Sequence, residues 1–175
     1  PMRHGLTLGE LALFCNREMA IGTDLEVVPA QGWRRHQLAP DTGQPWVFPS
    51  PNMPAFATAL VYPGQVLWEG TNISEGRGTT LPFELFGAPF VDPREVQGVL
   101  RPADLAGCCL RPLWFEPTSG KWGGRTCGGF QIHVIDTDLF RPYRTSLALL
   151  QALRILYPEG FAYKAPPYEY EFERL

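Results

Sequence analysis

The chain has 175 residues, which is long enough for one domain with a sizeable core. Hydrophobic residues make up 45% and aromatic residues 13% of the chain, and this composition excludes a disordered protein. The net charge of -3, from 15 basic and 18 acidic residues, argues against a basic surface for nucleic acid. No apolar run reaches the roughly 20 residues that a membrane-spanning helix needs.

The first local signals lie near the amino terminus. Thr7 and Glu10 have the spacing of a capping box, and the apolar residues that follow recur at helical intervals. These signals predict a helix over 7–20 that stops at Gly22. Three of the four residues at 25–28 are apolar and none is a turn former, which predicts a short strand.

Five prolines between residues 40 and 54 exclude a central strand or a helix there, so a loop is expected. Pro54 is a suitable first residue for a helix over 54–62, ended by the Pro63-Gly64 pair. In the later segments, apolar residues recur sometimes at helical spacing and sometimes at the alternate positions of a strand, without regular βαβ order. The expected strands cover 83–86, 108–116, 129–136 and part of 161–175, and a glycine-rich connection at 117–128 joins the second and third of them. A helix is expected over 93–100, where Asp92 is a suitable cap and Pro93 a suitable first residue. Another is expected over 142–157, where leucines line one face.

This order of elements predicts an α+β fold: a single compact, loop-rich domain with a small, largely antiparallel sheet packed by helices. The four cysteines show no CxxC spacing, so we interpret them mainly as buried thiols. A disulfide between Cys109 and Cys127 stays open as an alternative, provided that the strands carrying them pair in register.

Residues 69–89 form a polar, glycine-rich stretch between apolar segments, and we take this stretch as the candidate site. Glu69 and Glu75 flank a turn-rich segment, so their carboxyl groups could face each other across a cleft as glycoside hydrolysis requires. The alternative is a structural role, in which the two glutamates cap helices or pair with Arg77. The residue types suit a hydroxyl-rich ligand such as a sugar better than a nucleotide or a metal.

Other residues also have two interpretations. Gly76 and Gly78 would let backbone amides approach a ligand, or they would serve a tight turn with positive φ. Arg3 could bind a carboxylate and His4 a sugar hydroxyl, although a surface histidine is the commoner case. One or two tryptophans could stack on a sugar ring. The tryptophans are Trp33, Trp46, Trp68, Trp114 and Trp122.

Four motifs, in the same order along the chain, resemble the DUF1343 family. The motifs are PMRHGLTLGELA at 1–12, GWRR and TGQPWVFPSPNMP within 32–54, ALVYPGQVLWEGTNISEGRGTTLPFELFGAP at 59–89, and the 111–136 region with a YP-G-F turn at 157–161. The family is associated with exo-acting β-N-acetylmuramidases of bacterial cell-wall recycling. The resemblance covers most of the chain, and the third motif is highly specific.

The resemblance implies a two-part enzyme with an amino-terminal Rossmann-like half, a carboxy-terminal half and a cleft between them. The principal catalytic Glu is expected in the amino-terminal half. Residues 1–175 are then expected to be a single domain equivalent to an excised carboxy-terminal half, inactive by itself. Its expected function is to supply cleft residues to a glycoside hydrolase that releases terminal N-acetylmuramic acid from peptidoglycan fragments. The alternative is a non-catalytic module that binds glycan or serves as an interface for the other half.

Carried over residue by residue, the resemblance implies a cleft wall. Glu69 and Glu75 are expected to be auxiliary carboxylates, while the primary catalytic residue is unknown. The expected substrate-binding residues are Arg3, His4, Asn52, Asn72, Arg77, Thr79 and Thr80. No cofactor and no metal are expected. The expected partners are a muropeptide or another muramic-acid glycan and the amino-terminal half, without nucleic acid or a membrane span, in a bacterial periplasm or outside the cell.

Overall fold

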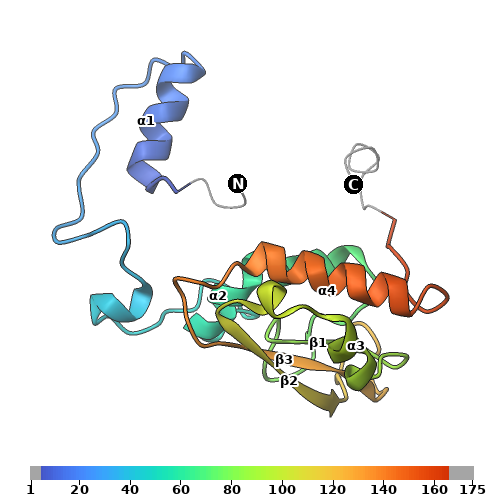
Figure 1. Cartoon of the computed structure of the whole chain (residues 1–175). Coiled ribbons are helices and arrows are strands. Elements are labelled where there is room, and N and C mark those ends of the chain that lie inside the picture. Colours follow the sequence, from blue (N-terminus) through green and yellow to red (C-terminus); the bar gives the residue numbers. More distant parts are fainter. Residues whose placement is uncertain (1–4, 166–175) are drawn as a thin grey trace. The chain divides into compact units, whose positions relative to one another are not determined.

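The computed structural model describes residues 5–165 (Figure 1). The chain divides into two compact units, Pro1–Pro45 and Trp46–Leu175, and we describe each by itself. Whether they fold as the single domain expected over 1–175 stays a prediction. None of the helices within residues 5–165 combines the length and the apolar run needed to cross a bilayer.

The first unit contains helix α1 (Leu8–Glu18) and a short 3₁₀ helix, η1 (Ala39–Thr42). The predicted capping box is confirmed, because Thr7 Oγ1 accepts from the Glu10 amide at 3.1 Å and Glu10 Oε2 accepts from the Thr7 amide at 2.8 Å. Arg35 pairs with Glu10 at 2.5 Å and so ties the loop to the start of α1. This arrangement fixes the helix by local contacts, since α1 itself has no buried residue.

The strand predicted at 25–28 is wrong, because residues 21–30 have no regular structure. The physical reason is that this segment has no partner strand. A strand is stabilised by pairing with a neighbour, and an apolar run does not provide that neighbour. Val28 is 84% exposed, and the segment contacts α1 and not another strand, since Val27 lies beside Gly9.

The second unit holds a three-stranded antiparallel sheet in the order β1-β3-β2, with helices over one face (Figure 1). The sheet pairs Phe86 with Phe130 and Leu110 with Ile132. The predicted α+β class with a small antiparallel sheet is therefore confirmed. The elements are α2 (Phe56–Gln65), η2 (Val66–Gly70), β1 (Leu85–Ala88), α3 (Pro93–Val99), η3 (Pro102–Leu105), β2 (Cys108–Phe115), β3 (Cys127–Val134) and α4 (Pro142–Leu156).

The core of this unit lies between the sheet and the helices α2 and α4. Trp68 is fully buried and stacks on Phe86 at a ring distance of 5.2 Å, and Phe86 in turn contacts Phe130. Leu149 and Leu153 of α4 are also fully buried, on the face that the leucine spacing predicted. Burying side chains of this size contributes about 1.5–3 kcal/mol each.

Helix α2 differs from its predicted bounds at both ends. It begins at Phe56, with Ala55 as the N-cap, and it continues through Pro63 to Gln65. Pro63 has no backbone N–H to donate within the helix, and packing against α4 stabilises the last turn instead. Gly64 lies so close to α4 that an added Cβ would stand 2.1 Å from the Pro142 carbonyl oxygen. The side-chain amide of Gln65 also donates, through Nε2, to Ser146 Oγ at 2.8 Å.

The other elements lie close to their predicted positions. Strand β1 begins two residues after the predicted 83–86 start, and β3 begins two residues before 129. Asp92 caps α3 by accepting from the Arg94 amide at 2.9 Å. Of the strand expected within 161–175, Tyr163 makes a single bridge with Thr71, and everything from residue 166 lies outside the described residues.

The cysteines are free, so the alternative of a Cys109–Cys127 disulfide is wrong. The register explains why: Cys109 lies opposite His133 and Cys127 opposite Phe115, at the two ends of the β2–β3 hairpin. Cys127 is a buried thiol, as interpreted from the sequence, and burial raises its pKa to about 11. Cys109, by contrast, is exposed.

Candidate functional site

The candidate site lies on the irregular segment that joins η2 to β1. Two glycines with positive φ set its path, Gly76 at 78° and Gly78 at 80°. An added Cβ at Gly76 would lie 2.8 Å from the Leu85 carbonyl oxygen, and one at Gly78 would lie 2.5 Å from that of Ser119. The structure therefore supports the tight-turn interpretation of these glycines, which press the segment against β1 and the 116–126 connection.

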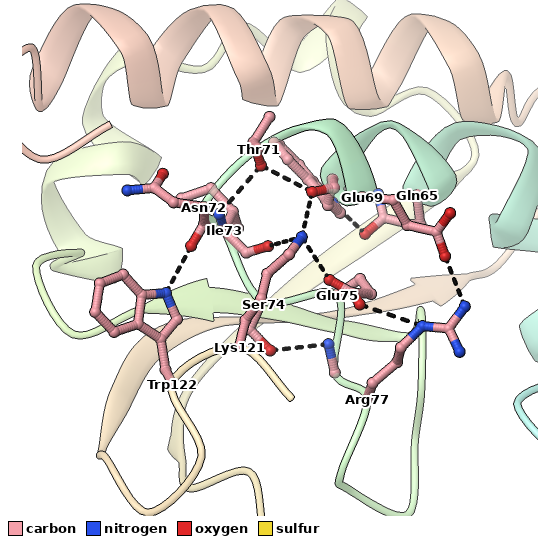
Figure 2. Close-up of polar contacts among 12 residues, drawn as sticks. Gln65, Glu69, Thr71, Asn72, Ile73, Ser74, Glu75, Arg77, Lys121 and Trp122 are labelled. Carbon is pink, nitrogen blue, oxygen red and sulfur yellow. Dashed lines mark hydrogen bonds and ion pairs between the residues drawn. The ribbon is translucent and has the colours of Figure 1, made fainter. Parts of the chain in front are cut away.

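Four charged side chains meet beside this segment, Glu69, Glu75, Arg77 and Lys121, and we call them the charged cluster (Figure 2). Arg77 Nη2 lies 2.6 Å from Glu69 Oε1, and Arg77 Nε lies 3.2 Å from Glu75 Oε1. Lys121 Nζ lies 2.8 Å from Glu75 Oε2. The cluster holds two cations and two carboxylates, so its formal charge is zero.

The charged cluster runs from the surface into the protein. The Glu69 and Arg77 side chains are each 40% exposed, whereas those of Glu75 and Lys121 are 6% and 12% exposed. Ion pairs at the surface contribute little, but a buried charge without its partner is costly. The exposed Glu69–Arg77 pair can therefore be broken at little cost in free energy, whereas separating the buried Glu75–Lys121 pair is costly.

Lys121 is the functional candidate that the sequence analysis missed. Its ammonium group contacts the carbonyl oxygens of Trp68 at 2.5 Å and Ile73 at 3.0 Å as well as Glu75 (Figure 2). Among the described residues, Glu75 Oε2 has no hydrogen-bond partner apart from this ion pair. Burial lowers the pKa of Lys121, and the Glu75 carboxylate opposes that effect.

Two residues beside the cluster have positive φ although neither is glycine: Phe83 at 63° and Trp122 at 60°. The Phe83 ring lies under the Arg77 guanidinium, with 5.1 Å between the guanidinium carbon and the ring centroid. Trp122 follows Lys121 and donates its indole N–H to the Asn72 carbonyl at 2.6 Å. Such backbone strain costs about 1–3 kcal/mol per residue and tends to occur at functional sites.

Several predicted substrate-binding residues have structural contacts here. The Asn72 side chain donates to the Gly160 carbonyl at 2.7 Å and accepts from the Ala162 amide at 3.0 Å. Thr79 Oγ1 donates to the Gly76 carbonyl at 2.6 Å. These bonds hold the segment together, and substrate binding by either residue stays a prediction.

The remaining predicted residues are placed as follows. Thr80 is exposed on the same segment, and Asn52 is half-buried in the turn at 50–53. Arg3 and His4 lie outside the described residues. Of the tryptophans proposed for sugar stacking, Trp68 is fully buried and Trp122 is half-buried; Trp33, at 47%, and Trp114, at 59%, are the more exposed.

The geometry bears on the two interpretations of Glu69 and Glu75. Both carboxylates contact Arg77, which is the structural pairing considered as the alternative. Glu75 is enclosed between two cations, so it is suited to orient Arg77 rather than to meet a substrate directly. Within residues 5–165, no group of three or more His, Cys, Asp or Glu side chains is placed to hold a metal ion.

Comparison with known proteins gives consistent matches. The C-terminal family model of exo-beta-N-acetylmuramidase NamZ matches residues 60–175, and the N-terminal model matches residues 1–57. Residues 1–57, grouped with the carboxy-terminal half in the sequence analysis, therefore resemble the amino-terminal half. The chain is also 46% identical over 163 residues to peptidoglycan beta-N-acetylmuramidase NamZ of Bacillus subtilis (strain 168).

That match covers 93% of this chain and 39% of the Bacillus relative, so the chain spans about two fifths of the relative's length. A solved DUF1343 family protein from Bacteroides fragilis NCTC 9343 is 30% identical with a TM-score of 0.82, over 90% of this chain and 42% of that chain. A second DUF1343 structure from the same organism is 24% identical with a TM-score of 0.54, over 98% and 53%, and shows the fold alone. From these matches, the chain belongs to the NamZ exo-β-N-acetylmuramidase family, also known as DUF1343.

Proposed function

We propose that this chain is part of a glycoside hydrolase that releases terminal N-acetylmuramic acid from peptidoglycan fragments, to which it supplies residues of the substrate cleft. The observation that supports this most is the 46% identity to a peptidoglycan β-N-acetylmuramidase over 93% of the chain. The substrate would be a muropeptide or a related glycan. The proposed place of action is the bacterial periplasm or the cell exterior, where peptidoglycan lies.

Within this proposal, the exposed and the buried residues of the charged cluster have different roles. Glu69 and Arg77, both 40% exposed, would meet the sugar. Glu75 would orient the Arg77 guanidinium through the contact to Nε, and Lys121 would hold Glu75. Cleft residues of this kind contribute by fixing the substrate in a reactive position, which is a large part of the catalytic effect in enzymes. The principal acid would come from the amino-terminal half.

A second candidate function is that of an interface for the amino-terminal half. Helix α1 buries none of its residues and leaves large apolar side chains exposed, among them Leu8 at 87%, Phe14 at 50% and Met19 at 70%. Residues 1–57 match the amino-terminal family model. Exposed apolar surface of this kind commonly marks a protein–protein contact, here with the remainder of that half.

A chimeric enzyme tests the main proposal. The 163 matched residues of the Bacillus relative are replaced by their counterparts from this chain, and hydrolysis of a chromogenic β-N-acetylmuramide is measured. We expect the chimera to be active and Glu75→Gln to lower its kcat/KM by about tenfold or more, because Arg77 loses its buried carboxylate partner.

Glu159→Gln is the matched control, since Glu159 is exposed in a turn of the second unit and its replacement is expected to leave the rate unchanged. A folded chimera with no hydrolysis would contradict the proposed function. Full activity in the Glu75→Gln chimera would instead favour a purely structural role for the charged cluster.

A further inference from the structure

Arg77 is fixed on two sides and exposed on a third. Glu75 contacts its Nε at 3.2 Å, and the ring of Phe83, which is 1% exposed, lies 5.1 Å from its guanidinium carbon. On the exposed side, Nη2 pairs with Glu69 at 2.6 Å. A guanidinium held in this way loses little freedom when it binds a carboxylate, and its planar fork matches two carboxylate oxygens.

The charge balance of the cluster identifies which ligand this exposed side would accept. Glu75 is shared between Lys121 and Arg77, so without Glu69 the two cations would face a single carboxylate. Both members of the Glu69–Arg77 pair are 40% exposed, and an exposed pair changes an equilibrium constant by only about 1.4- to 5-fold. If Glu69 turns away, the cluster carries a net positive charge at the surface, which favours an anion.

We propose that Arg77 recognises a carboxylate of the ligand, and that this carboxylate replaces Glu69 on the guanidinium. The inference rests on the proposed function, because N-acetylmuramic acid carries a lactyl carboxylate that N-acetylglucosamine lacks. Glu69 then occupies the carboxylate position in the ligand-free chain. Arg77 is the residue that distinguishes the two sugars, and Glu75 and Lys121 are its positioning residues.

An NMR titration of the chain tests the proposal by following the Nε–Hε signal of Arg77. The probes are N-acetylmuramic acid, N-acetylglucosamine and lactate at millimolar concentration. We expect N-acetylmuramic acid and, more weakly, lactate to shift the Arg77 signal, and N-acetylglucosamine to leave it in place. Equal responses to the two sugars, or no response of Arg77 to any probe, would overturn the proposal.

Two variants sharpen the test. Glu69→Gln removes the internal competitor, so its affinity for N-acetylmuramic acid is expected to rise about 1.4- to 5-fold, whereas Arg77→Met is expected to lower affinity by about tenfold or more. Arg94→Met is the matched control, because that side chain is 80% exposed and pairs with Asp92 on α3. An unchanged or weakened affinity in Glu69→Gln would contradict the exchange.

The outcomes distinguish a failure of the carboxylate recognition by Arg77 from a failure of the proposed hydrolase function. A chimera that hydrolyses the muramide equally well with Arg77→Met would retain the proposed function and refute the carboxylate recognition. A chimera without hydrolysis would refute the proposed function, and the titration of Arg77 would still decide whether the residue selects a carboxylate.

Discussion

Replacing Lys121 by methionine is expected to lower the free energy of unfolding of the second unit by about 3–5 kcal/mol. The variant leaves the carboxylate of Glu75, a side chain only 6% exposed, without its buried cation. It also leaves the carbonyl oxygens of Trp68 and Ile73 without the ammonium that contacts both. Urea unfolding followed by tryptophan fluorescence measures the loss, and a fall in Tm of about 10–20 °C is expected with it.

Lys164→Met is the matched control, since this lysine is exposed and acts on Lys121 as a nearby like charge, and a surface replacement changes stability by about 0.5 kcal/mol or less. The double variant Lys121→Met/Glu75→Gln removes both buried charges. It is expected to be less destabilised than the sum of the two single variants, because neither charge is then left unpaired. Additive effects would show that the buried pair is not energetically coupled.

Gly129→Ala is expected to destabilise the second unit by about 3–5 kcal/mol, because the central strand has no room for a side chain there. An added Cβ would lie 2.0 Å from the Phe86 carbonyl oxygen and 2.8 Å from the Gly87 Cα, both on the neighbouring strand β1. Relief requires β1 to separate from β3, and Gly87 also bridges to Ser74, one residue before Glu75. The variant should therefore disturb the charged cluster as well as the sheet.

Gly98→Ala provides the contrast. Gly98 lies in α3, and an added Cβ meets no atom within 4 Å, so this variant is expected to stabilise the chain by about 0.5–1 kcal/mol. Thermal unfolding of both variants measures the difference. If Gly129→Ala unfolds at the temperature of the unchanged chain, β1 and β3 do not approach as closely as described.

Local signals in the sequence predicted the helices well. The capping box at Thr7, the Asp92 cap before Pro93 and the leucine spacing in 142–157 each depend on residues within one or two turns of each other. The two strands β2 and β3 were also predicted close to their observed bounds, whereas their antiparallel pairing was left open. In these elements, local preference and tertiary packing favour the same structure.

The errors arose where distant contacts decide the outcome. Residues 25–28 have strand-like composition but no partner strand, and α2 passes Pro63 because Gly64 and Gln65 pack against α4. The disulfide alternative depended on a register that the sequence does not contain; the pairing separates Cys109 from Cys127.

The candidate site was predicted in part. Glu69, Glu75 and Arg77 could be identified because they lie within nine residues of one another in a polar segment. Lys121 could not, since it meets Trp68 and Ile73 across 53 and 48 residues. One signal was available: the chain has two lysines among its 15 basic residues, and one of them lies in the glycine-rich SGKWGG segment.

The placement of a substrate cleft at the charged cluster is tested most directly by mapping backbone amide shifts while the chain is titrated with N-acetylmuramic acid. We predict that the largest changes fall on residues 69–80 and on the Lys121–Trp122 pair, which the ion pair and the Asn72 contact join to that segment. Changes confined to the first unit or to the exposed Trp114 on β2, or none at saturating sugar, would contradict the account.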